Sequence, residues 1–533
     1  MGATALSALP QPPYSVSESP PSFVPGATVR EILLLATTSL VLLVVEVLTS
    51  NPRILFGRYL WLDELQAKLF ASKPSMWESL VALAHSGDFT PPVYHVLARA
   101  SWGLLGGSAE TAFRTLSFVS IWVAVVLIYV LLRRTFAVLP ALVAVLAFWS
   151  SHPIIEYAFY ARPYAPLLAA IAGFCLIYGL DNKRLLVTGL TALIAALVCT
   201  LHYFGVFALA AVVLGDTIAR REPLPVIIRR CVPAAAGPIA LAFCWPFVHA
   251  WKAGQTAFAD YLPAQTLTSA MTNVLHSWAG APEATAVLVL AWCISDVTLL
   301  IIRVRGCGRE KPHSRNIGPL QPVAALVGLI LVPIFVAMFS ILAYPAMLIR
   351  YMIPGLLGVT VLLAIVASDT PPRILAGTAL LLILLGAWNL RLYSAVQMKW
   401  QASEDQMMKI GENDELPIVT FSSHEAYLLY AYAPSLRNRL FVADLRENHR
   451  SRLFRGMLVE YEFENKWLTV YPDLPKLVNL DQLRHMGKFH LLNPDSWVLA
   501  EQENRPLKSF PLQEIAQAFS FEKVGDLYEV GPN

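Results

Sequence analysis

The run LQPVAALVGLILVPIFVAMFSIL, residues 320–342, holds no charged side chain. A helix of this length crosses a hydrocarbon core of roughly 30 Å, which needs about 20 residues at 1.5 Å per residue. Similar uncharged blocks recur along the 533-residue chain, which is 56% hydrophobic and only 14% charged. Soluble domains carry about 25% charged residues. The sequence therefore predicts a polytopic α-helical membrane protein.

The apolar blocks, separated by charged breaks, predict about eleven transmembrane helices. They lie near residues 31–49, 114–132, 136–151, 164–180, 185–201, 203–219, 232–249, 284–302, 320–342, 351–367 and 373–393. A single helix over 185–219 would be about 52 Å long, which exceeds the bilayer. We therefore expect a break near Gly205.

Basic residues predict the orientation of these helices. They cluster after every second span, at Arg133, Arg134, Lys183, Arg184, Arg220, Arg221, Arg229, Arg230, Arg303, Arg305, Arg309, Lys311, Arg315 and Arg373. The positive-inside rule makes that side cytoplasmic. The N-terminus is then cytoplasmic, and loops 50–113, 152–163 and 250–283 lie outside with the tail after residue 394.

Three parts of the chain are expected. Residues 1–30 are rich in Pro and Ser and read as a disordered leader without the basic start of a signal peptide. Residues 31–393 form the membrane module. In residues 394–533 charged residues return, and short apolar runs predict a small α/β domain. Its strands are expected at 416–421, 440–442, 488–492, 496–500 and 526–530, with a helix at 425–432.

The six cysteines form no CxxC pair or Cys/His cluster, and none falls in the tail after residue 394. Isolated cysteines in apolar blocks are typical of small buried side chains. We expect no disulfide framework.

The first external loop, residues 50–113, carries the adjacent carboxylates Asp63 and Glu64. Two interpretations apply: a solvated loop or helix cap, or a general base or cation site at the lipid–water boundary. The same loop holds Asp88 and the run Pro91-Pro92-Val93-Tyr94, whose prolines fix the backbone direction and could hold a re-entrant segment. Amphipathic segments 64–72 and 76–85 predict interfacial helices.

Arginines and aromatic residues mark the external ends of later spans. They are found in Glu156–Tyr164, which includes Arg162, in His202-Tyr203, and in Arg350-Tyr351. An arginine here either clamps a phosphate with its planar fork or extends to lipid headgroups. An aromatic belt explains the tyrosines but not the arginines, so the ionisable residues are expected to converge on one cavity.

These motifs, in this order, resemble bacterial GT-C glycosyltransferases, and most closely the protein mannosyltransferase and aminoarabinose transferase-like group, family 39-like. The likeness covers about residues 30 to 400. It rests on Trp61-Leu62-Asp63-Glu64, Pro91-Pro92-Val93-Tyr94, Arg114, Ala161-Arg162-Pro163-Tyr164, His202-Tyr203 and Arg350-Tyr351. This sequence departs from the family pattern at Tyr160-Ala161-Arg162, where many relatives have Glu-Ala-Arg. Glu156 is nearby but not equivalent.

The resemblance implies a bacterial inner-membrane enzyme that transfers a sugar from a polyprenyl phosphate to a hydroxyl of a lipid, glycan or protein acceptor on the periplasmic side. It assigns catalysis to Asp63 and Glu64, with Asp63 as the general base. Arg162, Arg350 and Tyr351 would bind the donor phosphate. The substrate pocket is expected to include Asp88, Tyr94, Glu156, Tyr164, His202 and Tyr203.

We expect no obligatory cofactor. An Asp-Glu pair can hold Mg²⁺ or Mn²⁺, but a lipid monophosphate leaving group builds less charge than a nucleotide diphosphate, and arginines can meet it. Activity is therefore expected to survive chelation.

Two other classes compete with an enzyme. A transporter is disfavoured because no internal repeat with broken helices is seen. In a non-catalytic lipid-binding protein, the acidic pair and the arginines would have no evident function. No P-loop, HExxH or GxSxG motif is present, so ATP-driven transport and common hydrolase chemistry lack support.

Overall fold

The computed structural model describes residues 29–86, 90–178, 180, 185–220, 223–247, 267–279, 323–342, 348–409, 415–420, 423–444, 474–492, 519–524 and 527–532. The chain divides into two compact units, residues 1–44 and 45–533. Helix α1 (Val29–Thr49) begins in the first unit, and the second unit holds every later element.

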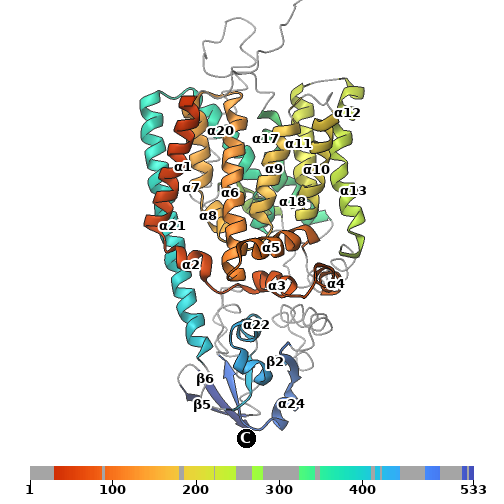
Figure 1. Ribbon diagram of the computed structural model, residues 1–533, viewed down its shortest axis with the longest axis vertical. Helices are drawn as coiled ribbons and strands as arrows, with labels where there is room; N and C mark the ends of the chain where they lie inside the picture. The colour runs from red at the N-terminus through yellow and green to blue at the C-terminus, as the bar shows by residue number, and fades with distance from the viewer. Residues whose placement is uncertain are drawn as a thin grey trace, which may run out of the picture. The chain divides into compact units, whose positions relative to one another are not determined.

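The first part of the second unit is helical. Its α-helices are α2 (Pro52–Gly57), α3 (Leu62–Ala71), α4 (Met76–Ser86), α5 (Pro92–Leu105), α6 (Ala109–Arg133), α7 (Val138–Ser150), α8 (His152–Ala158), α9 (Tyr164–Tyr178), α10 (Leu185–Leu201), α11 (Gly205–Arg220), α12 (Leu224–Ala234), α13 (Ala236–Phe243), α15 (Leu267–Ala279), α17 (Ala324–Gly328), α18 (Val332–Leu342), α19 (Ile349–Met352), α20 (Gly355–Ser368) and α21 (Pro372–Met408). Helices α6, α7, α9, α10 and α11 run side by side, and α3, α4 and α5 lie across one end of them (Figure 1). The predicted interfacial helices at 64–72 and 76–85 are α3 and α4.

Among the described residues, four helices are long and apolar enough to cross a membrane, or five if the bent pair α7 and α8 counts as one span. Shorter apolar helices include α9, α10 and α20. The predicted span 284–302 lies outside the described residues, and each other predicted span overlaps a described helix. The total of eleven crossings stays a prediction.

The expected break near Gly205 is confirmed, because α10 ends at Leu201 and α11 begins at Gly205. A Cβ at Gly205 would collide with the backbone oxygen of Val198, so this tight turn needs glycine. A second break lies between α7 and α8, whose axes are bent by 66° relative to one another. Pro153 stands in the first turn of α8, and the Asn389 amide donates to the Ser150 carbonyl at 2.9 Å, which satisfies one end of the broken helix.

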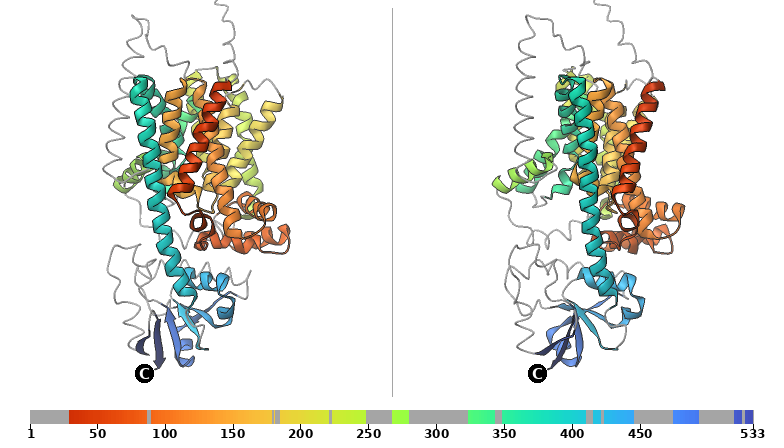
Figure 2. Two further views of the ribbon diagram at one scale, coloured as in Figure 1. Left: turned by 60° about the vertical axis from the view of Figure 1, so that its left-hand side comes forward. Right: turned by 90° about the vertical axis from the view of Figure 1, so that its left-hand side faces the viewer.

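Helix α21 is 37 residues long and changes character along its length. Its first part is apolar, whereas its end reads Gln-Ala-Ser-Glu-Asp-Gln over residues 401–406. Helix α21 thus connects the apolar helices to the C-terminal sheet (Figure 2).

The C-terminal region contains a six-stranded mixed sheet in the order β3-β2-β1-β4-β6-β5. Strands β1, β2, β3 and β4 are parallel neighbours, and β5 and β6 join antiparallel. The elements are β1 (Ile418–Thr420), α22 (Ser423–Tyr432), β2 (Leu440–Asp444), β3 (Lys476–Asn479), α24 (Leu480–His485), β4 (Phe489–Leu492), β5 (Phe519–Val524) and β6 (Leu527–Pro532). Strands β1, β2, β4 and β6 overlap the strands expected at 416–421, 440–442, 488–492 and 526–530, and α22 overlaps the helix expected at 425–432. The strand expected at 496–500 lies outside the described residues.

Cys175, Cys199, Cys231 and Cys244, the cysteines within the described residues, are free thiols. Cys175 and Cys199 are buried, as expected for small apolar side chains.

Candidate functional site

The candidate site starts at the first turn of α3, where Asp63 and Glu64 follow one another. Successive residues on an α-helix point about 100° apart, so the two carboxylates face different surroundings. The backbone N–H of Trp61 donates to Glu64 Oε2 at 2.9 Å, which closes the helix N-terminus. The helix start thus aims Glu64 inward and leaves Asp63 partly exposed, with 24% of its side chain accessible.

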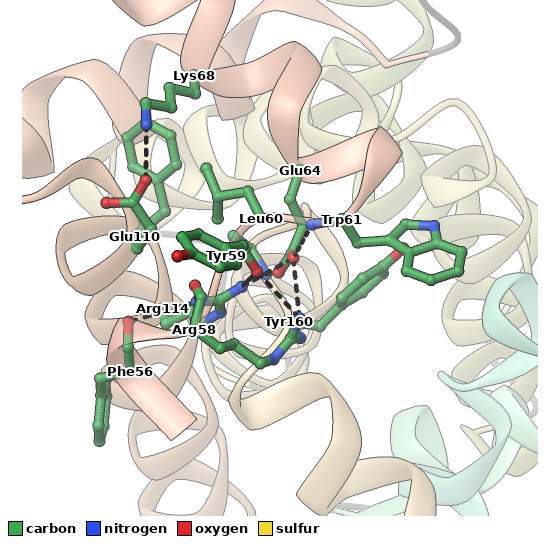
Figure 3. A network of polar contacts seen from close by, with 12 residues as sticks. Phe56, Arg58, Tyr59, Leu60, Trp61, Glu64, Lys68, Glu110, Arg114 and Tyr160 are labelled. Atoms are coloured by element: carbon green, nitrogen blue, oxygen red, sulfur yellow. Dashed lines mark hydrogen bonds and ion pairs between the residues drawn. The ribbon is translucent and has the colours of Figure 1, made fainter. Parts of the chain in front are cut away.

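Glu64 lies at the centre of a buried ionic network (Figure 3). Its side chain is fully buried, with Arg114 Nη2 at 2.9 Å and Arg58 Nη1 at 3.6 Å from Oε2. The Ala161 N–H donates to Oε1 at 2.6 Å. Burial alone would raise the pKa of Glu64, but the two guanidinium groups and the N–H groups of Ala161 and Trp61 hold it below its usual value. Glu64 is therefore an ionised structural centre that ties α3, α6 and the loop before α9 together.

Arg114 extends this network to the backbone. It donates to the carbonyl oxygens of Phe56, Arg58 and Tyr59, the last at 2.9 Å. These carbonyls lie in the last turn of the short helix α2 and just beyond it, so one guanidinium fixes the path of the chain that leads into α3.

Asp63 faces the two arginines predicted to bind phosphate. Arg350 Nη1 lies 3.3 Å from Asp63 Oδ2, and Arg162 Nη2 lies 3.9 Å from the same oxygen. Arg162 also donates to the Asp63 backbone carbonyl at 2.9 Å. The structure therefore brings together three residues that are up to 287 positions apart in sequence.

A cavity of about 420 Å³ adjoins this triad. Arg350 is part of its wall, and Asp63, which is not among the lining residues, lies behind that wall in an ion pair with Arg350. Both aromatic rings and hydrogen-bonding side chains line the cavity, a composition suited to a sugar. The lining residues are Arg58, Trp61, His152, Glu156, Tyr157, Tyr160, Arg350, Leu392, Tyr393, Val396, Gln397 and Trp400.

An aromatic column leads away from the cavity. The rings of Tyr160 and Tyr164 are stacked, with centroids 6.4 Å apart. The centroid of the Tyr164 ring lies 6.5 Å from that of Tyr351, and the Tyr351 ring stacks on Phe204 with centroids 4.5 Å apart. The His202 ring packs between the rings of Tyr164 and Tyr351, with ring centroids 5.5 Å and 5.2 Å apart, respectively. Burial lowers the pKa of His202 to about 3, and Arg162 and Arg350 act in the same direction, so its ring is neutral at physiological pH.

Phe204 also lines a second cavity of about 370 Å³ between α11, α13 and α18. Its other lining residues are Tyr203, Phe207, Pro238, Leu241, Ala242, Trp245 and Phe339. None of the described residues in this wall is charged, so the second cavity suits a hydrocarbon chain. Stacked aromatic rings thus join an apolar cavity to a polar one that carries Arg350.

The remaining predicted site residues are distributed unevenly. Glu156 lines the polar cavity, Tyr203 lines the apolar one, and Tyr164, His202 and Tyr351 form the column between them. Tyr94 was expected in the substrate pocket, but it is fully buried in α5 with its ring 5.6 Å from His95, and it lines neither cavity. Asp88 lies outside the described residues.

Sequence reasoning missed the contribution of α21 to the cavity. Tyr393, Val396, Gln397 and Trp400 line one wall from a single helix face. Their spacing of three and four residues was the available signal, because residues three or four apart share a helix face. Sequence reasoning also missed Arg58. This arginine stands alone among apolar residues shortly before Trp61, which only weakly indicates a role in the cavity.

Within the described part of the chain, no group of three or more His, Cys, Asp or Glu side chains is placed to hold a metal ion. Asp63 and Glu64, the pair considered for Mg²⁺ or Mn²⁺, point to different arginines.

No protein-family model matches the sequence, and no curated protein matches it. Among solved structures, ArnT from Cupriavidus metallidurans in the apo state is similar, with 12% identity, coverage of 94% of this chain and 98% of that chain, and a TM-score of 0.55. ArnT from the same organism bound to undecaprenyl phosphate gives 12% identity, coverage of 93% and 97%, and a TM-score of 0.54. This likeness shows a GT-C glycosyltransferase-like fold, so the fold expected from the motifs is confirmed.

Proposed function

We propose that this chain is a membrane glycosyltransferase that moves a sugar from a polyprenyl-phosphate donor to a hydroxyl acceptor at the outer face of the bacterial inner membrane. The observation that carries the proposal is that Arg350, which lines a cavity rich in aromatic and hydrogen-bonding side chains, pairs with Asp63 at 3.3 Å. A GT-C-like fold and a similar structure with undecaprenyl phosphate bound support it further.

The chemistry needs a base at the attacking acceptor oxygen and a cation at the departing phosphate oxygen. The acceptor oxygen forms a bond to the anomeric carbon, the bond from that carbon to the phosphate oxygen breaks, and polyprenyl phosphate leaves. Asp63 takes the acceptor proton. Arg350 and Arg162 stabilise the negative charge on the departing phosphate.

The two cavities fit the two parts of an amphipathic donor. Trp61, Tyr157, Tyr160 and Trp400 offer flat faces to a sugar ring, and Glu156 offers hydrogen-bond acceptors. The apolar cavity suits the polyprenyl chain. Tyr351, beside Arg350 and stacked on Phe204, stands where the phosphate and the hydrocarbon would meet.

The decisive experiment is turnover by purified protein in detergent, with undecaprenyl-phosphate-linked sugars and a panel of lipid, glycan and protein acceptors. Each reaction is run in excess EDTA and again with Mg²⁺ or Mn²⁺. We expect donor consumption that survives EDTA, because arginines meet the phosphate charge. Loss with EDTA that either ion restores would assign a metal role to the acidic residues. Donor binding without turnover across the panel would instead favour a non-catalytic lipid-binding protein or transporter.

The proposed topology places the N-terminus in the cytoplasm and residues 394–533 in the periplasm. The basic clusters after alternate spans are the physical reason, through the positive-inside rule. Alkaline phosphatase fused after residue 400 is expected to be active, and a cytoplasmic reporter at the same point inactive. The reverse pattern would overturn the orientation and place the Asp63 site on the wrong face for a periplasmic acceptor.

Replacing Arg350 with lysine is expected to lower kcat/KM for the donor about ten- to hundredfold. Lysine keeps the charge but loses the planar fork, and a charge-assisted hydrogen bond contributes about 1.5–3 kcal/mol. Steady-state kinetics at varied donor concentration measures the change. Arg437→Lys, at an exposed position of the C-terminal region, is the matched control. Normal kinetics for Arg350→Lys would remove Arg350 from the phosphate site.

A further inference from the structure

Tyr432, the last residue of α22, joins the C-terminal region to the segment that carries Asp63. Its hydroxyl donates to Glu110 Oε1 at 2.6 Å and accepts from the Leu60 N–H at 3.1 Å. Its ring lies 4.6 Å from the Tyr59 ring and carries the Lys68 ammonium 4.0 Å above its face. One side chain therefore contacts the loop before α3, α3 itself and the first turn of α6.

These contacts lie on both sides of the helix start that orients Asp63. Leu60 directly precedes Trp61, the N-cap of α3, and is fully buried. Its N–H cannot bond water there, so loss of the Tyr432 hydroxyl would leave a buried donor unsatisfied. Glu110 lies one helical turn before Arg114 on α6, and Lys68 on α3 pairs with the same Glu110 oxygen at 2.7 Å. The hydroxyl thus holds α3 against α6 beside the Glu64 network.

Helix α21 fastens the same loop from a second direction. Gln401 Oε1 accepts from the Tyr59 N–H at 3.2 Å, and the Tyr59 hydroxyl donates to Asp405 Oδ1 at 3.0 Å. Trp61 packs on Trp400 with ring centroids 5.6 Å apart. The loop from Tyr59 to Trp61 is therefore held by elements that follow it by more than 300 residues.

Tyr432 keeps its proton in this setting. Burial raises the pKa of its hydroxyl well above the usual value, and the neighbouring Glu110 carboxylate acts in the same direction. The hydroxyl can thus donate to Glu110 while it accepts from Leu60.

We infer that Tyr432 is a positioning residue for Asp63: through Leu60 and Glu110 it fixes the start of α3, so the C-terminal region is part of the scaffold that sets the geometry for transfer. The inference rests on the proposed function for its effect on turnover. Misplacing a reacting group by about 1 Å can cost roughly a hundredfold in rate, so the contact is expected to act on kcat.

Tyr432→Phe keeps the ring and its packing while removing the hydroxyl. We expect kcat to fall about tenfold and the donor KM to change less, because Tyr432 does not itself line the donor cavity and acts on it only through Leu60 and the neighbouring Trp61. Tyr430→Phe removes a hydroxyl from the same helix, where the ring packs beside Arg437, and is expected to match the wild type. In an Asp63→Asn background, Tyr432→Phe should have no further effect, whereas general destabilisation would lower the residual activity of both backgrounds equally and overturn the inference.

Hydrogen exchange without substrate separates this inference from the proposed function. We expect faster exchange in peptides covering residues 60–70 in Tyr432→Phe, and wild-type exchange in Tyr430→Phe. Unchanged exchange in Tyr432→Phe would overturn the positioning contact whatever the activity is, and faster exchange with a normal kcat would overturn its link to Asp63. A wild-type protein inactive on all donors would overturn the proposed function, while the exchange data would still decide whether Tyr432 holds α3.

Discussion

Asp63→Asn is expected to lower kcat about a hundredfold or more, in line with the usual contribution of general-base catalysis. Asparagine matches the size of aspartate but cannot take the acceptor proton. The contact with Arg350 at 3.3 Å is retained in weaker form, since the amide oxygen can still accept a hydrogen bond. The measurement is kcat and donor KM in the polyprenyl-phosphate-sugar assay.

The split between kcat and KM separates two roles for Asp63. A base acts on kcat, whereas a residue that only tethers Arg350 and Arg162 acts mainly on donor KM. Asp481→Asn makes the same chemical change at an exposed position of α24, where it pairs with Arg484, and should leave both constants unaltered. Near-normal kcat in folded Asp63→Asn protein would rule out the base role.

Glu64→Gln is expected to lower the free energy of unfolding by about 3–5 kcal/mol, the usual cost of removing one partner from a buried ion pair. The substitution leaves Arg114, which is fully buried, without its ion-pair partner and removes the nearest carboxylate from Arg58, which is 6% exposed. Glu64 Oε2 accepts hydrogen bonds from the Trp61 N–H and from Arg114, and Arg58 lies within ion-pair distance of the same oxygen. If the NH₂ group of glutamine took this position, it would meet other donors and could not accept from them. Thermal unfolding in detergent and the yield of monodisperse protein measure the loss.

The pH dependence of stability offers a second reading of Glu64. Its pKa is lower in the folded protein than in the unfolded chain, so its stabilisation is present above the unfolded pKa and disappears as pH falls through the folded one. In Glu64→Gln, the free energy of unfolding should therefore fall less steeply as the pH is lowered than it does in the wild type. Glu78→Gln, on the exposed face of α4, is the control and should keep the wild-type pH dependence. Wild-type stability in Glu64→Gln would show that the network contributes little, and a selective loss of kcat would return Glu64 to a catalytic role.

Neighbouring carboxylates thus have separate expected effects, one on turnover and one on folding. The sequence alone could not assign them, because Asp63 and Glu64 are adjacent in the same acidic pair. The partners that distinguish them are remote: Arg114 and Ala161 surround Glu64, and Arg350 faces Asp63.

Local chemistry did determine much of the fold. An uncharged block such as residues 320–342 has to be helical to satisfy its backbone in an apolar environment, so its location is encoded in composition. The break at Gly205 followed from the length of residues 185–219 against the thickness of a bilayer, and the structure confirms it. The motif order also pointed to the GT-C-like fold, which the likeness to solved structures confirms.

Only the tertiary structure decided which side chains share a cavity. Trp400 and Gln397 on α21 complete the wall around Arg350, and Tyr432 reaches Leu60 across 372 residues. Tyr94, whose motif suggested substrate binding, is buried instead. The physical reason is that helix formation and membrane insertion depend on neighbouring residues, whereas such contacts depend on how complete helices pack. The three- and four-residue spacing on α21 shows which residues share a helix face, but not which other elements that face meets.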